Sequence, residues 1–179
     1  MENTVLITGA ATGIGLALAR KLDAAGWTVF AGVHRTPPDA LMDGASERLT
    51  PLPLDVTDID QIGRAVEKIQ DGLGDRGLSL LVSNAAMTGA PGPVESVRIE
   101  EFERLMDVNL WGPLRLVQAF LPILRKHARP RIVIVSSASV HITIPLGCAY
   151  PVSKSALAAL AQHLRLEMEP FGIEVTDLQ

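Results

Sequence analysis

The chain has 179 residues, 47% of them hydrophobic, which is enough for one domain with a buried core. Its formal net charge of −4 gives no broad attraction for nucleic acid, and its single cysteine, Cys148, excludes an internal disulfide and a cysteine-based metal site. No apolar run is long enough to span a membrane, and the first residues lack the basic start of a signal peptide. We therefore expect residues 1–179 to form a single cytoplasmic domain that binds neither membrane, nucleic acid nor metal.

Short apolar runs alternate along the chain with stretches of helical periodicity. The runs that predict strands are 5–7, 28–33, 49–54, 78–83, 131–136 and 173–175. The first predicted helix follows a glycine loop and ends near Gly26. The other predicted helices are 58–70, 97–108, 112–128 and 152–168, and Asp58 is the predicted N-cap of the first of these. Strands that are apolar throughout and separated by helices indicate a parallel sheet covered on both faces. Right-handed crossovers give an α/β fold with a doubly wound sheet, ending at about the sixth strand.

The glycine loop Thr8-Gly9-Ala10-Ala11-Thr12-Gly13-Ile14-Gly15 follows the first strand and opens the first helix. Gly9 permits a tight turn, Gly13 lets the backbone approach a pyrophosphate, and Gly15 lets the helix pack close to the sheet. The helix N-terminus adds N–H groups and partial positive charge for phosphates. An ordinary strand-to-helix turn is the alternative, but the position within a strand–helix–strand unit favours a dinucleotide site. The expected contacts are Gly9, Thr12, Gly13, Ile14 and Gly15.

The end of the second strand bears on the choice of dinucleotide. A site specific for NAD usually carries an acid there for the ribose 2′-hydroxyl, yet residues 24–38 contain no Asp or Glu. Val33 occupies the expected position and is followed by His34 and Arg35. Because Arg35 can pair with a 2′-phosphate that an acid would repel, NADP(H) is favoured over NAD(H). The alternative is that His34 and Arg35 form a solvated loop.

Tyr150 and Lys154 lie four residues apart, and Ser137 precedes Tyr150 by thirteen residues. On a helix, positions i and i+4 share a face, so the phenol and the ammonium would point into one cleft. A neighbouring cation favours the phenolate and lowers a pKa that is about 10 when unperturbed. With a serine hydroxyl to hold an oxygen, these residues point to proton transfer to or from a carbonyl or an alcohol.

Several motifs occur in a fixed order along the chain: the Thr8–Gly15 loop, Asp55-Val56, Ser83-Asn84-Ala85-Ala86, Asn109, Ser137 and Tyr150-Pro151-Val152-Ser153-Lys154. Over essentially all 179 residues this set resembles the short-chain dehydrogenase/reductase family, which implies a Rossmann-like fold. One motif departs from the family pattern, since Ser83-Asn84-Ala85-Ala86 stands where the family has Asn-Asn-Ala-Gly.

The resemblance implies a role for each matching residue. Tyr150 would be the general acid of reduction and the base of oxidation. Lys154 would bond the nicotinamide ribose and lower the tyrosine pKa, and Ser137 would hold the substrate oxygen. Asn109 would anchor a water of the proton relay. The expected cofactor contacts besides the glycine loop are His34, Arg35, Asp55 and Val56 at the adenosine, Asn84, Ala85 and Ala86 along the cofactor, and Tyr150 and Lys154 at the nicotinamide end.

Plainer interpretations remain open for three of these positions. Asn109 also suits a helix junction, Asp55 also suits a turn, and Ser136 and Ser139 offer hydroxyls beside Ser137. The thirteen-residue spacing to Tyr150, the only tyrosine in the chain, selects Ser137.

The resemblance implies an NAD(P)-dependent oxidoreductase that interconverts a carbonyl and a secondary alcohol. The mostly apolar segment 140–149 suggests an apolar substrate. The helices at 112–128 and 152–168 correspond to those that pair subunits in the family, so we expect a homodimer or homotetramer. In that assembly we expect the apolar stripe Leu157, Leu160, Ala161, Leu164 and Met168 to be partly buried between subunits.

Family members continue beyond the position of Gln179 through a Pro-Gly turn, a substrate-covering segment and a seventh strand. We therefore expect a chain that lacks the substrate lid: a fragment, a naturally shortened member, or a chain completed by another subunit. The alternative function is a non-catalytic module that binds a dinucleotide or other subunits.

Overall fold

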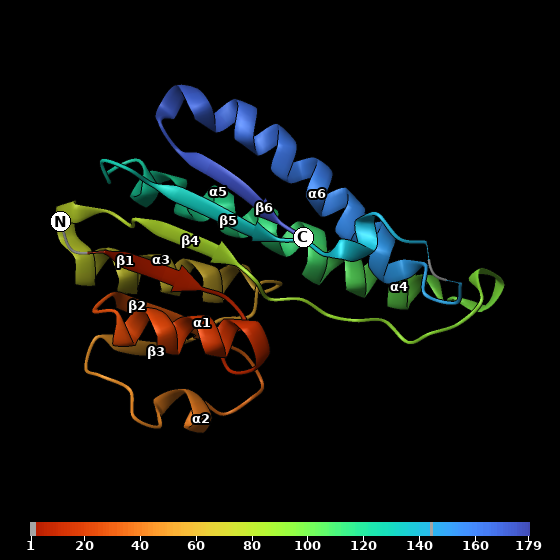
Figure 1. Ribbon diagram of the computed structural model, residues 1–179, viewed down its shortest axis with the longest axis horizontal. Helices are drawn as coiled ribbons and strands as arrows, with labels where there is room; N and C mark the ends of the chain where they lie inside the picture. Colours follow the sequence, from red (N-terminus) through yellow and green to blue (C-terminus); the bar gives the residue numbers. More distant parts are fainter. Residues whose placement is uncertain (1–2, 144) are drawn as a thin grey trace.

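The computed structural model describes residues 3–143 and 145–179, so expectations that involve Met1, Glu2 or Ile144 lie outside it. A parallel sheet forms the centre, with the strand order β3-β2-β1-β4-β5-β6 (Figure 1). Its strands are β1 (Thr4–Ile7), β2 (Thr28–Val33), β3 (Leu49–Pro53), β4 (Leu80–Ser83), β5 (Arg131–Val135) and β6 (Glu174–Leu178). The doubly wound α/β fold predicted from the sequence is confirmed.

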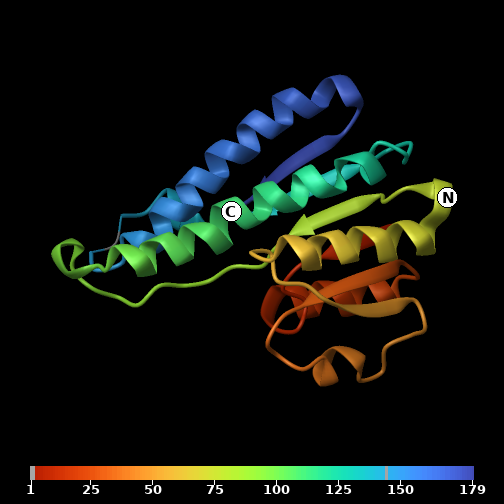
Figure 2. The same ribbon diagram turned by 180° about the vertical axis from the view of Figure 1, so that it is seen from behind.

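Helices cover both faces of this sheet. They are α1 (Gly13–Ala24), α2 (Asp39–Met42), α3 (Ile59–Leu73), α4 (Ile99–Met106), α5 (Gly112–Leu124) and α6 (Ala149–Met168). Short 3₁₀ turns lie at Gly74–Arg76, Val94–Ser96, Ala138–Val140 and Glu169–Phe171. One apolar core joins α3, α5 and α6 to the sheet, and a second core joins α1 and α2 to the other face (Figures 1 and 2). Because both faces are covered, the strands are apolar throughout.

The two helices predicted at 97–108 and 112–128 form one continuous helical stretch. Residues Asp107–Trp111 between α4 and α5 are π-helical, and α5 begins directly at Gly112. Pro113 is the second residue of α5 and has no N–H to donate back to the π-helical segment that precedes it. π-Helical segments are rare and frequently lie at functional sites.

The apolar stripe of α6 packs against the chain's own core rather than lying open for a subunit. Leu157, Ala161, Leu164 and Met168 are buried there, and Leu160 is partly buried against the same cluster. The expectation that the stripe is partly buried between subunits was wrong for these four residues, because the chain's own sheet, chiefly β6, already covers them, while the expected assembly itself stays a prediction. No helix within the described residues is both long enough and apolar enough to cross a membrane.

Candidate functional site

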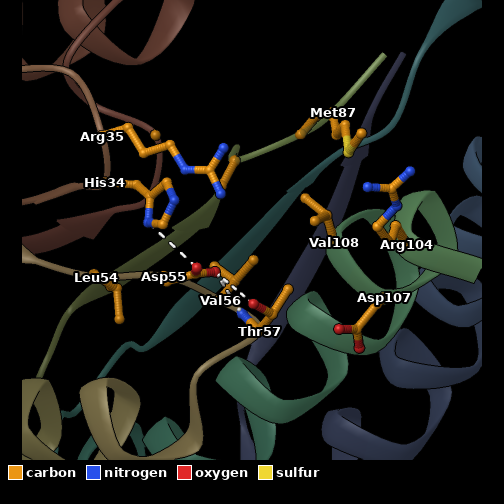
Figure 3. A pocket seen from close by; sticks show the side chains of 13 residues that line it. His34, Arg35, Leu54, Asp55, Val56, Thr57, Met87, Arg104, Asp107 and Val108 are labelled. Carbon is orange, nitrogen blue, oxygen red and sulfur yellow. Dashed lines mark hydrogen bonds and ion pairs between the residues drawn. The ribbon is translucent and has the colours of Figure 1, made fainter. Parts of the chain in front are cut away.

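A cavity of about 450 Å³ lies at the carboxyl ends of the strands, beside the switch point where the strand order reverses between β1 and β4 (Figure 3). Such switch points are where doubly wound sheets bind ligands. The cavity takes residues from the glycine loop, from the ends of β2, β3 and β4, and from α4 with the π-helical segment. Its lining is Gly9, His34, Arg35, Leu54, Asp55, Val56, Thr57, Ala85, Ala86, Met87, Arg104, Asp107 and Val108.

The glycine loop fits closely against the end of β4. Gly9 has φ of +66°, in the left-handed region that glycine adopts without strain. A side chain at Gly15 would overlap the Gly9 carbonyl oxygen and lie 2.7 Å from Asn84 Nδ2. Asn84 Nδ2 in turn donates to the carbonyl oxygens of Thr8 (2.9 Å) and Gly9 (3.3 Å). Asn84 therefore fixes the shape of the loop.

Thr8 is a structural anchor that the sequence did not single out. Its side chain is fully buried, and Oγ1 accepts the backbone N–H groups of Asn84 and Ala85, both at 3.0 Å. Two segments more than seventy residues apart are thereby locked together at the switch point. The only sequence signal for this role is the polar residue at the end of an otherwise apolar strand.

We expect Thr8→Val to lower the free energy of unfolding by about 3 kcal/mol, because two N–H groups lose their acceptor. Thr8→Ser keeps the hydroxyl and serves as the matched control, with a much smaller loss. Urea denaturation of the three proteins measures the difference. Equal losses for valine and serine would assign the effect of Thr8 to packing instead of hydrogen bonding.

A histidine and a carboxylate face each other across the ends of β2 and β3. His34 Nδ1 lies 3.3 Å from Asp55 Oδ2, as Figure 3 shows. Partial burial by itself would raise the pKa of Asp55, but hydrogen bonds from Thr57 and the charge of His34 outweigh it, so this pKa lies below its usual value. Asp55 is therefore an ionised part of the cavity wall at neutral pH, and its Oδ1 also accepts the Thr57 N–H and hydroxyl, as a turn residue does.

Arg35 also lines the cavity and is exposed. Within residues 3–143 and 145–179, its guanidinium has no ion-pair partner. A cation without a protein partner at the edge of a cavity can bind an anionic group of a ligand.

Asn109 lies in the π-helical segment and is completely buried. Its Oδ1 accepts the Met87 N–H at 2.8 Å, and its Nδ2 donates to the Met87 carbonyl at 2.9 Å and to Ser153 Oγ at 3.0 Å. Ser153 Oγ donates to the Tyr150 carbonyl at 2.8 Å. Asn109 therefore joins the segment after β4 to the start of α6, which carries Tyr150.

Tyr150 and Lys154 both lie near the N-terminus of α6, which begins three residues earlier than predicted. Lys154 Nζ stands 5.8 Å from the centre of the Tyr150 ring and donates to the Val135 carbonyl at 2.8 Å. The lysine is only 2% exposed, and this burial lowers its pKa to about 8, against the opposing charge of Asp177. Neither partner was expected from the sequence.

Ser137 lies two residues beyond Val135 at the end of β5. It is half-buried, and its Oγ accepts the Ser139 N–H at 3.1 Å. Ser136, in contrast, is buried and donates its backbone N–H to Leu178 at 2.8 Å. The accessible hydroxyl next to β5 is therefore that of Ser137.

The predicted site residues fall into three groups. The cavity wall holds Gly9, His34, Arg35, Asp55, Val56, Ala85 and Ala86. The loop and its support hold Thr12, Gly13, Ile14, Gly15 and Asn84, and the third group around the start of α6 holds Asn109, Ser137, Tyr150 and Lys154. The sequence did not indicate Met87, Arg104, Asp107 or Val108 as part of the wall, since only the fold brings α4 to the cavity.

A family model described as short chain dehydrogenase matches residues 3–179, and the chain belongs to this family. Estradiol 17-beta-dehydrogenase 2 from Mus musculus is 36% identical over 181 residues, which cover 99% of this chain and 47% of that protein. The chain thus spans about half the length of this curated relative.

Two solved structures extend the comparison. A short-chain dehydrogenase from Streptomyces avermitilis superposes with a TM-score of 0.90 at 32% identity, over 99% of this chain and 64% of the other. ElxO with NADP bound gives a TM-score of 0.89 at 25% identity, over 99% and 72%.

Proposed function

We propose that the chain carries the cofactor-binding and proton-transfer part of an NAD(P)-dependent oxidoreductase that interconverts a carbonyl and a secondary alcohol. The observation that carries this proposal is the arrangement of Tyr150 and Lys154 on one face of α6, which hydrogen bonds of Ser153 and Asn109 connect to Met87 in the cavity wall. Tyr150 gives its phenolic proton to the substrate oxygen in reduction and takes a proton from the alcohol in oxidation. Ser137 holds that oxygen, and Asn109 keeps α6 in place through Ser153.

The residues present fit a bound dinucleotide. The close contact of Gly15 with Gly9 brings the start of α1 against β4, and Thr12 makes no side-chain cap in the described part of the chain. The first N–H groups of α1 are therefore available for a pyrophosphate. When bound, the nicotinamide supplies or accepts the hydride. Asp55 and Val56 would form the wall for the adenine, and Lys154 would hold the ribose.

NADP(H) is the cofactor we favour, because Val33 stands where an NAD site would carry an acid, and Arg35 nearby has no ion-pair partner among the described residues. We expect Arg35→Ala to weaken NADPH binding about 10-fold to 100-fold, the loss of one charge-assisted contact, and to leave NADH binding unchanged. Arg129→Ala removes an exposed cation near the opposite end of the sheet and is the matched control. Nicotinamide fluorescence measures the affinities of the wild type and of both variants for NADPH and for NADH. Equal losses for NADPH and NADH would contradict the role of Arg35.

An apolar substrate suits the surroundings of Tyr150. Ile142 and Leu146 in the loop before α6 and Val94 in the preceding connection are exposed, and the Gly92 N–H donates to the Leu146 carbonyl at 2.7 Å. The loop before α6 and the segment with Gly92 and Val94 are thus joined and present apolar side chains together. Estradiol 17-beta-dehydrogenase 2, one relative, is named for a steroid alcohol. We therefore propose an apolar carbonyl or alcohol as the substrate. We also propose that the chain assembles as a homodimer or homotetramer.

The test begins with a titration of the chain with NADPH and with NADH, followed by turnover with a panel of apolar ketones and aldehydes. Saturable binding of NADPH together with turnover supports the oxidoreductase. Binding without turnover of any carbonyl would favour the non-catalytic dinucleotide-binding module, and the absence of binding would overturn the proposal.

A further inference from the structure

Asp177 on β6 lies at the same end of the sheet as Lys154 on α6. In the register of β5 with β6, Asp177 is the partner of Ile134 and Leu178 is the partner of Val135. Val135 is the residue whose carbonyl oxygen accepts the Lys154 ammonium at 2.8 Å. The strand register therefore brings a carboxylate beside the point where the lysine is held.

The Asp177 carboxylate is only partly satisfied. Its Oδ2 accepts Gln179 Nε2 at 2.9 Å, whereas Oδ1 is buried and has no hydrogen-bond partner within the described chain. A buried carboxylate oxygen without a partner is costly unless a positive charge lies nearby. Lys154 is a buried cation on which the charge of Asp177 acts, although no ion pair within 4.0 Å joins the two among the described residues. The contact of its ammonium with Val135 uses only one of three donors.

We propose that Asp177 is a positioning residue that keeps the Lys154 ammonium charged and fixed at the Val135 carbonyl, beside Tyr150. The role rests on the proposed function, in which that ammonium serves the ribose and the phenol. No motif of the sequence marks Asp177, because it depends on the pairing of β6 with β5.

The electrostatic balance at Lys154 supports this role. Burial lowers the pKa of Lys154 from 10.5 to about 8, and the negative charge of Asp177 acts in the opposite direction. The other groups that face this pair are Tyr150 on the same helix and His141, whose Nε2 contacts the Oε1 of Gln179. Without the Asp177 charge, only the lowering by burial remains, so Lys154 would lose its proton at a lower pH.

The test titrates Lys154 directly by ¹³C NMR of protein labelled at the lysine ε-carbons. The chain has four lysines, and Lys21, Lys68 and Lys126 are exposed, so arginine substitutions at these three assign their signals. In the wild type we expect one signal to titrate near pH 8, because burial lowers the pKa of Lys154 to about 8. We expect Asp177→Asn to lower that midpoint by about one unit or more, and Asp177→Glu to restore most of it.

Two further variants make the test decisive. Glu174→Gln removes an exposed carboxylate of the same strand, which pairs with Arg131 at 3.1 Å, and should leave the Lys154 midpoint unchanged. Asp177→Val, which suits a strand, replaces the asparagine variant if that protein does not fold, with the same expected decrease. A Lys154 midpoint that stays in place without the Asp177 carboxylate would overturn the proposal.

The activity profile gives a second readout. The alkaline limb of kcat/KM should move to lower pH in Asp177→Asn by the same shift as the NMR midpoint, with little change at pH 6. If Asp177→Asn shifts the Lys154 midpoint but the wild-type protein shows no turnover, the role of Asp177 is supported and only the proposed function is overturned. If the wild-type protein is active but Asp177→Asn leaves the Lys154 midpoint unchanged, the role of Asp177 is overturned and the proposed function stands.

Discussion

Tyr150→Phe is expected to lower turnover by about 10²-fold to 10⁴-fold, the usual contribution of a general acid or base. The ring keeps its place near the N-terminus of α6, with Lys154 Nζ 5.8 Å from its centre, but loses the hydroxyl that we propose exchanges a proton with the substrate oxygen. No other tyrosine exists in the chain to replace it. Steady-state rates with NADPH and an apolar ketone at pH 7 measure the loss.

The same variant carries its own control. The Tyr150 hydroxyl makes no hydrogen bond within the described residues, so its removal should leave the free energy of unfolding unchanged. NADPH binding should also remain within about twofold, because the phenol contributes little to a bound phosphate or adenine. A fully active Tyr150→Phe protein would overturn the proposed proton transfer, whereas a large loss of NADPH binding would mean that the Tyr150 hydroxyl acts mainly by holding the cofactor.

Gly15→Ala is expected to cost about 3 kcal/mol of unfolding free energy and to abolish dinucleotide binding. The added methyl group would overlap the Gly9 carbonyl oxygen and lie 2.9 Å from the Gly9 carbonyl carbon. These are backbone atoms of the loop, so they cannot turn aside as a side chain does. The start of α1 would have to move away from β4, and with it the N–H groups for the phosphates. Urea denaturation and NADPH titration measure both effects.

Gly63→Ala is the matched control for this change. Gly63 lies within α3, and a methyl group there meets nothing within 4 Å. Since alanine is the better helix former, this variant should gain about 1 kcal/mol and bind NADPH normally. Glycine to alanine is thus expected to lower the free energy of unfolding at Gly15 and to raise it at Gly63. A tolerated Gly15→Ala would mean that the loop relaxes easily and does not need the glycine.

Much of the fold could be predicted because it depends on periodicities that short segments carry themselves. The range of β2 agreed fully with its apolar run, and Asp58 caps α3 through the N–H groups of Asp60 and Gln61 as expected. The start of α6 was predicted three residues too late, because polar side chains in its first turns obscure the apolar pattern. Ser153 and Lys154 are among the most buried residues of that helix. Hydrophobicity alone does not reveal a polar side chain that is buried for function.

The candidate site could be predicted only as far as its motifs are local. The glycine loop and the Tyr150–Lys154 pair each lie within one segment, so spacing alone suggests what they do. Thr8 and Asp177 act through strand neighbours that are distant in the sequence, and Arg104 reaches the cavity only through the placement of α4. Register between distant segments, which one sequence does not display, determines these contacts.

The hydrogen bonds of Thr8 also limit the order in which the protein can assemble during its synthesis. Its hydroxyl needs the N–H groups of Asn84 and Ala85, and β1 needs β4 as its second neighbour. A nascent chain that contains only β1, β2 and β3 therefore lacks the contacts that give the glycine loop its final shape. Dinucleotide cannot assist the first half of folding, and contacts of such long range are slow to form. Before β4 is synthesised, the nascent chain depends on the local stability of its first strands and helices to remain soluble.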